Sequence, residues 1–538
     1  MLEKIRRNYI FLYIMLSGFF YFLINFKYLF SLTDANDPLQ YIIPSLYPEN
    51  GFEFIDRILL WLWLRLISNL PIPLEYVSGI ATLLVTTFTL MLSLWYLNKK
   101  VNIIASSIFL LLYVFSPAIL EISSYTYPMQ LFTLILLFVS ICIDLLSNNK
   151  IKFFIIGFFL VFLLFTKIQA YSFVIFIAFY LYYISSKRDF FRNLRYLIFG
   201  SICAFLLILS IIIYLDGYIV LKNMILNYLN EMFQVQYKGR AAGGFPPFFL
   251  YLIEPSALLA FIGLLLGTIK KEFFKIKLIS IIGLVQLVGL LFVYLVTSRG
   301  GTIIGNYIID AYILGLISIS AVFGILLCNL KKSFFLISIV SLVLTFGLLF
   351  FLSTSSENYQ PGSNPIYIFK NSYYVIIGII CFVMSLLFLF FLKKDDSKVI
   401  PIIFILVLLV IFKSKSAVDS TKYFKNLGLI YHNTAKKISE INNLKGPLLI
   451  LFYEEGKYIN DSSKKLHSVY DTFYNRNNKI VLSNDIHSKF NTVITNNISL
   501  LNNDNIFNIN NSYEDIKIRK YKGLFILNMK RKKIKKIF

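Results

Sequence analysis

Charged residues are scarce in this chain. Asp, Glu, Lys and Arg make up only 15% of its 538 residues, whereas hydrophobic residues make up 58%. Soluble domains average about 25% charged and about 45–50% apolar residues. A soluble globule of this composition would have to expose far more apolar surface than folded proteins normally do. The shortage of charge therefore excludes an ordinary soluble enzyme and a disordered chain, and it indicates a polytopic membrane protein.

Histidine and cysteine are also rare. The three histidines, His432, His467 and His487, all lie in the polar C-terminal part, so the apolar part has no histidine with which to bind a metal. The four cysteines stand within apolar runs, and their spacing is not that of a metal site. We interpret them as small core residues.

Acidic residues are the scarcer of the two charged classes, with 28 against 52 basic residues and a net charge of +24. Such an excess can indicate a nucleic-acid partner, but no nucleic-acid-binding motif is present. The basic residues instead gather in short loops between apolar runs, as they do on the cytoplasmic side of membrane proteins. We therefore expect membrane lipids and no nucleic acid as partners, and the basic tail 530–536 is a candidate contact for anionic lipid.

Long apolar runs dominate the first 415 residues. A membrane-spanning helix needs roughly 20 apolar residues, and on this basis we predict about thirteen such helices, of which the fifth and sixth are short. The predicted spans are 9–30, 76–97, 102–122, 128–147, 152–166, 168–185, 196–215, 246–269, 278–297, 307–329, 333–353, 372–392 and 398–413.

Pairs of lysines recur in alternate loops and predict the orientation of the chain. Lys99-Lys100, Lys270-Lys271, Lys331-Lys332 and Lys393-Lys394 all fall in loops on the side of the N-terminus. That side is therefore expected to be cytoplasmic. An odd number of helices then places the C-terminal residues outside the cytoplasm. Frequent Asn, Lys and Ile are typical of AT-rich bacterial genomes, so we expect a bacterial inner (plasma) membrane.

The composition changes abruptly near residue 415 and predicts a second domain. Residues 416–538 are rich in Asn, Ser and Lys, and their short apolar runs 447–452, 479–482 and 523–527 are typical of strands. The predicted fold is thus an all-α polytopic membrane domain, residues 1–415, followed by a small extracytoplasmic α/β domain, residues 416–538.

The first outer loop, residues 31–75, carries an unusual acidic pair. Asp34 and Asp37 stand three residues apart, just after the first predicted helix and before Pro38. The apolar segment 55–67 follows, and it contains Trp61 and Trp63 but is too short and too charged to span. We expect it to lie along the membrane interface. The alternative is that both aspartates are plain turn residues.

This order of features resembles the GT-C superfamily of membrane glycosyltransferases, which includes protein O-mannosyltransferase-like enzymes, aminoarabinose transferases and oligosaccharyltransferase catalytic subunits. The matching parts are Asp34, Asp37 and Tyr41 followed by the 53–70 segment, and the stretches 71–84, 116–129 and 306–315. The resemblance implies an enzyme that moves a sugar from a polyprenyl-phosphate donor to an extracytoplasmic acceptor, which would be a lipid, a glycan or a protein.

The resemblance also suggests roles for individual residues. Asp37 is the first candidate for the base, and Asp34 is its partner or the base itself. Such a pair is compatible with a divalent metal, Mg or Mn, but the residues identify no certain cofactor.

The leaving phosphate needs positive charge, which arginine and lysine supply. The candidates are Arg299, Lys167 and Arg240. Each has a plain alternative: a residue that reaches for lipid headgroups, a turn between helices, and a flexible linker. Tyr41, Glu121 and Glu254 are candidates for contact with substrate, because a carboxylate within an apolar helix usually faces a cavity or a partner.

Two other functions fit a membrane protein of this kind. A transporter or flippase for lipid-linked sugars would carry charges at mid-membrane, and few occur here. A polysaccharide polymerase or ligase would carry its large outer loop late in the chain.

Asp310 lies at the start of the tenth predicted helix, where the helix dipole alone accounts for an acidic residue.

Overall fold

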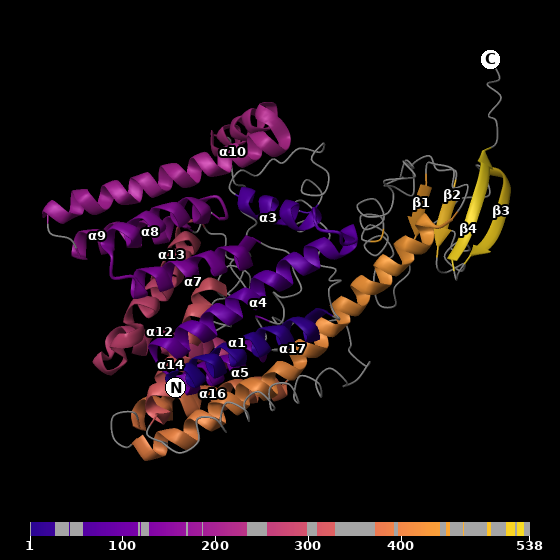
Figure 1. Ribbon diagram of the computed structural model, residues 1–538. Helices are drawn as coiled ribbons and strands as arrows, with labels where there is room; N and C mark the ends of the chain where they lie inside the picture. The colour runs from indigo at the N-terminus through magenta and orange to yellow at the C-terminus, as the bar shows by residue number, and fades with distance from the viewer. Residues whose placement is uncertain are drawn as a thin grey trace. The chain divides into compact units, whose positions relative to one another are not determined.

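The computed structural model describes most of the apolar part and a smaller share of the C-terminal part (Figure 1). The described residues are 2–26, 42, 57–116, 119, 128–167, 170–184, 187–233, 255–297, 309–328, 372–391, 396–441, 448–451, 466, 492–495, 513–521 and 524–531.

The described residues are mostly helical. The helices are α1 (Leu2–Phe26), α3 (Ile58–Ser68), α4 (Leu74–Lys100), α5 (Ile103–Val114), α7 (Pro128–Leu145), α8 (Asn149–Leu164), α9 (Ala170–Ile184), α10 (Lys187–Phe233), α12 (Pro255–Ile269), α13 (Lys277–Thr297), α14 (Ile309–Leu327), α16 (Ser372–Phe391) and α17 (Asp396–Ser439). A 3₁₀ helix, Lys271–Ile276, joins α12 to α13.

Several of these helices are suited to a bilayer. Among the described residues, five are long and apolar enough to cross it: Asn8–Phe26, Leu74–Lys100, Pro128–Leu145, Asp189–Leu215 and Ile309–Leu327. Large apolar side chains such as Phe19, Phe199 and Phe382 are exposed on their helices. In water this exposure would be costly, whereas lipid tails cover it.

The chain divides into two compact units. Of the described residues, those from Val77 to Tyr423 belong to the first unit, together with α1 and α3. The second unit contains Ile42, the residues Ile72–Tyr76, and the described residues from Phe424 onward.

The helices α5 and α14 of the first unit run in opposite directions. The Asn102 side chain at the start of α5 donates to the carbonyl of Gly324 near the end of α14, at 3.0 Å. At the opposite end of α5, Ser116 bonds to Tyr312 in the first turn of α14. The side chain of Asn102 also caps α5 by accepting from the Ala105 N–H, which satisfies a backbone donor that the helix leaves free.

Two helices extend beyond the predicted spans. α10 continues through residues 216–233, which were expected to form a loop, and Gly217 interrupts it with a φ of 82° that glycine tolerates. α17 continues to Ser439, beyond the span predicted to end at 413. Its last turns bury Tyr431, Ala435 and Ile438, whose spacing forms an apolar stripe along the polar C-terminal half of this helix.

The second unit contains a four-stranded sheet with the order β1-β2-β4-β3. Its strands are β1 (Leu448–Leu451), β2 (Thr492–Thr495), β3 (Tyr513–Tyr521) and β4 (Leu524–Arg531). β1 pairs parallel with β2, while β4 pairs antiparallel with both β2 and β3. β1 and β4 overlap the predicted strands 447–452 and 523–527, and the predicted strand 479–482 lies outside the described residues.

Candidate functional site

A hydrogen-bonded group of hydroxyls joins three helix ends within the first unit. The Tyr312 hydroxyl, in the first turns of α14, donates to Ser256 Oγ at the start of α12, at 2.6 Å. It also bonds to Ser116, which follows α5 and whose Oγ accepts from the Ile119 N–H at 3.2 Å. All three side chains are buried. We call this end of the first unit, where α5 ends and α12 and α14 begin, the polar end.

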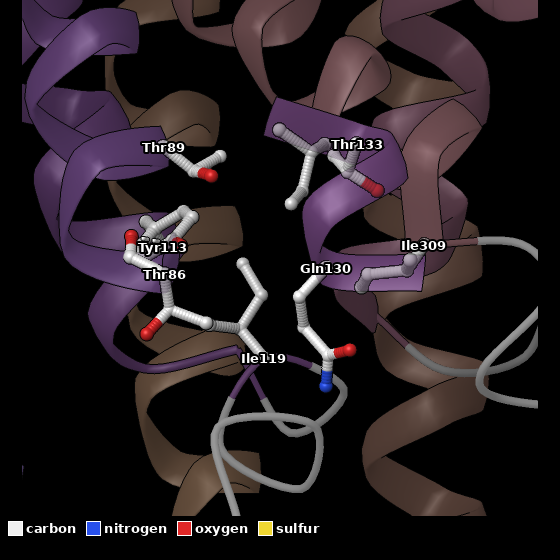
Figure 2. A pocket seen from close by; sticks show the side chains of 8 residues that line it. Thr86, Thr89, Tyr113, Ile119, Gln130, Thr133 and Ile309 are labelled. Atoms are coloured by element: carbon white, nitrogen blue, oxygen red, sulfur yellow. Dashed lines mark hydrogen bonds between the residues drawn. The ribbon is translucent and has the colours of Figure 1, made fainter. Parts of the chain in front are cut away.

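A cavity opens beside these residues, between α4, α5, α7 and α14 (Figure 2). It is lined by Thr86, Thr89, Tyr113, Ile119, Gln130, Thr133, Ile309 and Ile313. Its volume is about 260 Å³ including the open mouth, but the space left free by the side chains is only about the size of one water molecule. A sugar would enter only if lining side chains moved.

The hydroxyls that line this cavity all donate to main-chain carbonyls. Thr89 Oγ1 bonds to the Val85 carbonyl at 2.8 Å and Thr133 Oγ1 to the Met129 carbonyl at 2.7 Å. Tyr113 donates to the Thr86 carbonyl at 2.8 Å. Since a hydroxyl has one proton but two lone pairs, these groups can only accept hydrogen bonds from a molecule in the cavity. The hydroxyls are therefore suited to a hydrogen-bond donor, while the amide of Gln130, which completes the uncharged lining, has both donor and acceptor atoms.

Two oppositely charged side chains are buried at the polar end. Lys167 follows α8 and is 6% exposed, and Asp310 in the first turn of α14 is 0% exposed. Burial opposes the ionised form of the Asp310 carboxylate, while the backbone N–H of Ala311 and the charge of Lys167 favour it to a smaller extent. No described side chain donates a hydrogen bond to either carboxylate oxygen. Buried charges persist when they are compensated in this way.

The helix α3 lies next to the Lys167 segment. The N–H of Leu59 in α3 bonds to the carbonyl of Phe165 at 3.2 Å, and Trp63 Nε1 donates to the carbonyl of Ala81 in α4 at 3.1 Å. The apolar segment expected at the membrane interface is thus a helix fixed to α4 and to the end of α8.

Solved structures of one protein share this architecture. The crystal structure of ArnT from Cupriavidus metallidurans in the apo state matches 97% of this chain and 98% of its own, with a TM-score of 0.51 and 12% identity. The structure of ArnT from the same organism bound to undecaprenyl phosphate matches the same shares of both chains, with a TM-score of 0.52 and 10% identity. This chain has the ArnT fold. No family model and no curated protein sequence matches it.

The ArnT-like fold confirms part of what the sequence predicts. The resemblance to GT-C glycosyltransferases is confirmed at the level of fold, and so is a mostly helical, multi-pass membrane protein. The count of thirteen helices, the separate α/β domain and the orientation of the termini stay predictions.

Of the predicted site residues, the described part of this ArnT-like fold contains Lys167. It is buried at the polar end, within range of Asp310, and it is not an exposed turn residue. The other candidates lie outside the described residues: Asp34, Asp37, Tyr41, Glu121, Arg240, Glu254 and Arg299. The described ranges hold no group of three or more His, Cys, Asp or Glu side chains suited to a metal.

Sequence reasoning passed over two residues of the polar end. Asp310 was explained by the helix dipole, and its place in the first turn of α14 agrees with that explanation. Its complete burial is an additional property that the dipole does not explain. Tyr312 lies in the stretch 306–315 that carries part of the resemblance, but no role was assigned to it. The usable signal was their spacing, because a carboxylate and a phenol two residues apart begin one of the most apolar helices of the chain.

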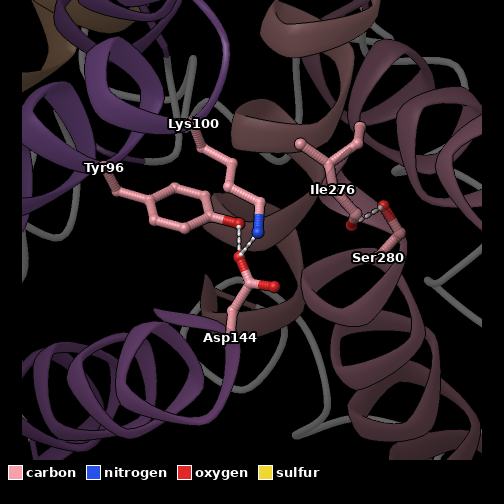
Figure 3. Close-up of polar contacts among 5 residues, drawn as sticks. All are labelled: Tyr96, Lys100, Asp144, Ile276 and Ser280. Atoms are coloured by element: carbon pink, nitrogen blue, oxygen red, sulfur yellow. Dashed lines mark hydrogen bonds and ion pairs between the residues drawn. The ribbon is translucent and has the colours of Figure 1, made fainter. Parts of the chain in front are cut away.

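A second polar group lies at the opposite end of the same helices (Figure 3). Asp144 Oδ2 accepts from the Tyr96 hydroxyl at 2.8 Å and pairs with Lys100 Nζ at 2.8 Å. The charge of Lys152 also acts on this carboxylate. We call this the lysine end; its contacts join α4 to α7 and are separate from the cavity.

Proposed function

We propose that this protein is a membrane glycosyltransferase that moves a sugar from a polyprenyl-phosphate donor to an extracytoplasmic acceptor. The observation that carries the proposal is the match to ArnT over nearly the whole of both chains, together with the undecaprenyl phosphate bound in one ArnT structure. The acceptor would be a lipid, a glycan or a protein, and its nucleophile a hydroxyl or an amine.

The chemistry requires a base near the acceptor. The acceptor oxygen or nitrogen forms a bond to the anomeric carbon of the sugar, the bond from that carbon to the phosphate oxygen breaks, and the bonding pair leaves with the polyprenyl phosphate. The proton of the acceptor passes to a carboxylate. We assign this role to Asp37, with Asp34 as its partner or its substitute.

The leaving phosphate requires positive charge. We assign it to Lys167 together with Arg299 and Arg240. Burial of Lys167 at the polar end supports the assignment, because a cation held away from water binds a phosphate more strongly than one in bulk solvent. We place Tyr41, Glu121 and Glu254 in contact with substrate on the same face.

The proposed orientation puts this chemistry outside the cytoplasm. The N-terminus and the lysine end would face the cytoplasm, and the polar end and residues 416–538 would face outward, in a bacterial plasma membrane. The polyprenyl tail of the donor would then lie in the bilayer, with its phosphate at the height of Lys167.

Substitution of the acidic pair tests the proposal. Membranes that contain the protein are given a polyprenyl-phosphate-linked sugar, and release of polyprenyl phosphate is measured. Asp37→Asn should lower the rate at least about hundredfold, because a positioned base contributes about 10²–10⁴-fold. Asp34→Asn should also lower it strongly.

The matched control is Asp189→Asn, which removes an exposed carboxylate paired with Arg192 and should leave the rate unchanged at equal protein level. Full activity in both first-loop variants would show that the base has been wrongly assigned.

A further inference from the structure

The 3₁₀ helix that joins α12 to α13 has a buried side and an open side. With three residues per turn, its side chains fall into columns of residues three positions apart. Phe273 and Ile276 form one column and are completely buried. Lys271 and Phe274 form another, which Lys277 continues at the start of α13, and all three are exposed. The open side therefore carries a phenylalanine between two lysines.

The packing of α13 against α14 fixes the depth of this 3₁₀ helix. Ser280 Oγ lies 2.9 Å from Ser318 Oγ, and a Cβ atom on Gly283 would lie 3.2 Å from the Cβ of Leu314. The two helices therefore run antiparallel, so the 3₁₀ helix, which precedes α13 and contacts α14, lies beside the last turns of α14. Because the span Ile309–Leu327 is long enough to cross the bilayer, its last turns mark a membrane boundary.

This boundary is the lysine end. Asn102 donates to the carbonyl of Gly324 in the last turns of α14. Asn102 follows two residues after Lys100, whose ion pair with Asp144 belongs to the lysine end (Figure 3). The lysines of the 3₁₀ helix are thus on the same side of the membrane as those at the end of α4.

Apolar side chains are exposed beside these lysines. Phe274 is 69% exposed, and Ile269 at the end of α12 is 72% exposed. In water this exposure is costly, whereas the acyl chains of a lipid cover it. Lys271, Lys275 and Lys277 can lay their apolar stems along the same surface and keep their charges in the headgroup layer. A soluble anion or a nucleic acid would leave the phenylalanine in water, so the surface fits a phospholipid.

The segment has more positive charge than its own side chains balance. Residues 270–277 contain four lysines and one acidic residue, Glu272. Within the described part of the chain, no carboxylate forms an ion pair with any of these lysines. Each lysine near an anionic membrane surface favours association about fivefold. The charge therefore selects anionic phospholipids over those with a neutral headgroup.

The same pairing of lysine and exposed apolar side chain recurs at neighbouring helix ends. Lys99 Nζ lies 5.0 Å from the ring centroid of Trp95, which is 39% exposed. In the first turn of α8, Ile151 is 51% exposed and stands between Lys150 and Lys152 in the chain. Tryptophan is typical of membrane–water interfaces. The repetition supports a lipid boundary at this depth.

We propose that residues 269–277 form a docking surface for the leaflet at the lysine end: Phe274 inserts among the acyl chains, and Lys271, Lys275 and Lys277 bind the phosphates of anionic phospholipids. The surface lies at the opposite end of the helices from the polar end. It is therefore independent of the proposed sugar transfer, which enters none of the measurements below.

Insertion of Phe274 is tested by fluorescence quenching. Full-length Phe274→Trp is placed in nanodiscs whose lipids carry bromine on the first part of the acyl chains. The emission that this variant adds to that of the wild type should be quenched. Added emission that is not quenched would place residue 274 in water and overturn the docking surface.

The preference for anionic lipid is measured at the same site. Brominated phosphatidylglycerol, at a low fraction in phosphatidylcholine nanodiscs, should quench the added tryptophan as strongly as about a fivefold larger fraction of brominated phosphatidylcholine. Lys271→Gln with Lys277→Gln, introduced into Phe274→Trp, should bring the two lipids close to parity. The matched control is Lys436→Gln with Lys437→Gln, two exposed lysines of α17 in the second unit, which should keep the preference.

Each remaining outcome counts against a stated part of the proposal. Equal quenching by the two brominated lipids in Phe274→Trp would show that the surface does not select anionic lipid. A preference that survives the loss of Lys271 and Lys277 would show that these lysines do not bind the phosphate. Inorganic phosphate at equal ionic strength should not remove the preference; if it does, the lysines bind free phosphate, and the assignment to lipid is wrong.

Discussion

At the scale of single residues, burial changes the acidity of one histidine in the second unit. His432 lies near the end of α17 and is 8% exposed. Burial lowers the pKa of its imidazole to about 4, from an ordinary value of 6.5. Between these two values the unfolded chain binds a proton that the folded unit does not, so stability falls as the pH falls from about 6.5 towards 4.

This predicts local opening of α17 in mild acid. Hydrogen–deuterium exchange of peptides within residues 428–441, corrected for the intrinsic rate, should show an opening equilibrium that rises up to about tenfold per pH unit below pH 6. In His432→Gln that rise should disappear, since glutamine does not titrate. An equal rise in the variant would place the pH sensitivity elsewhere in the unit.

Lys167 and Asp310 show how much of the candidate site the sequence could reveal. Lys167 was identified because it interrupts an apolar stretch, and it is buried at the polar end. Asp310 was undervalued because its complete burial arises only when other helices pack around the start of α14. No pattern within α14 itself carries that information.

At the scale of elements, α8 and α10 pack through glycines. A Cβ atom at Gly157 would collide with the carbonyl oxygen of Leu197, and one at Gly200 with that of Phe154. The Ser201 hydroxyl donates to the carbonyl of Gly157 at 3.0 Å across the same contact. The two backbones approach this closely only because both positions lack a side chain.

Gly157→Ala should therefore separate these helices and destabilise the protein by about 1–3 kcal/mol, the usual cost of an overpacked contact. Thermal unfolding of the purified protein in detergent measures the loss. Gly217→Ala serves as a comparison, because no atom lies within 4 Å of the added carbon there and only the backbone conformation, φ 82° and ψ 169°, is penalised, by about 1–3 kcal/mol. Unchanged thermal unfolding in Gly157→Ala would contradict the close-packed contact.

Elements were predictable where a run of apolar residues sets their length. The short pair of helices predicted at 152–166 and 168–185 corresponds to α8 (Asn149–Leu164) and α9 (Ala170–Ile184). The polar half of α17 was missed, because its helical stripe of Tyr431, Ala435 and Ile438 is embedded among Lys, Asn and Ser. Hydropathy alone locates membrane helices and overlooks amphipathic ones.

At the scale of the whole molecule, the orientation predicted from the lysine pairs is open to direct test. Cys328 follows α14, is exposed, and precedes Lys331-Lys332, whereas Cys381 is buried. A membrane-impermeant maleimide should therefore label Cys328 in inverted vesicles and not in intact cells. Lys520→Cys in a Cys328→Ser background, at an exposed position of β3, should show the opposite pattern. Labelling of Cys328 in intact cells would show that the orientation is the opposite of the predicted one.

The fold class was recognisable from the order of the apolar segments, although the chain is only 10–12% identical to ArnT. Long apolar runs follow from the thickness of the bilayer and do not depend on residue identities, so their order can be read from the sequence. The cavity between α4, α5, α7 and α14 could not be predicted, because it depends on how four helices that are separate in sequence come together.

The central claim is that this protein uses a polyprenyl-phosphate-linked sugar as its donor. The most direct measurement gives the purified protein in nanodiscs such a donor, with bacterial envelope lipids and glycans as acceptors, and follows release of polyprenyl phosphate. We predict release that depends on the protein and is lost in Asp37→Asn. A donor that stays intact with the wild-type protein, across sugars and acceptors, would contradict the account.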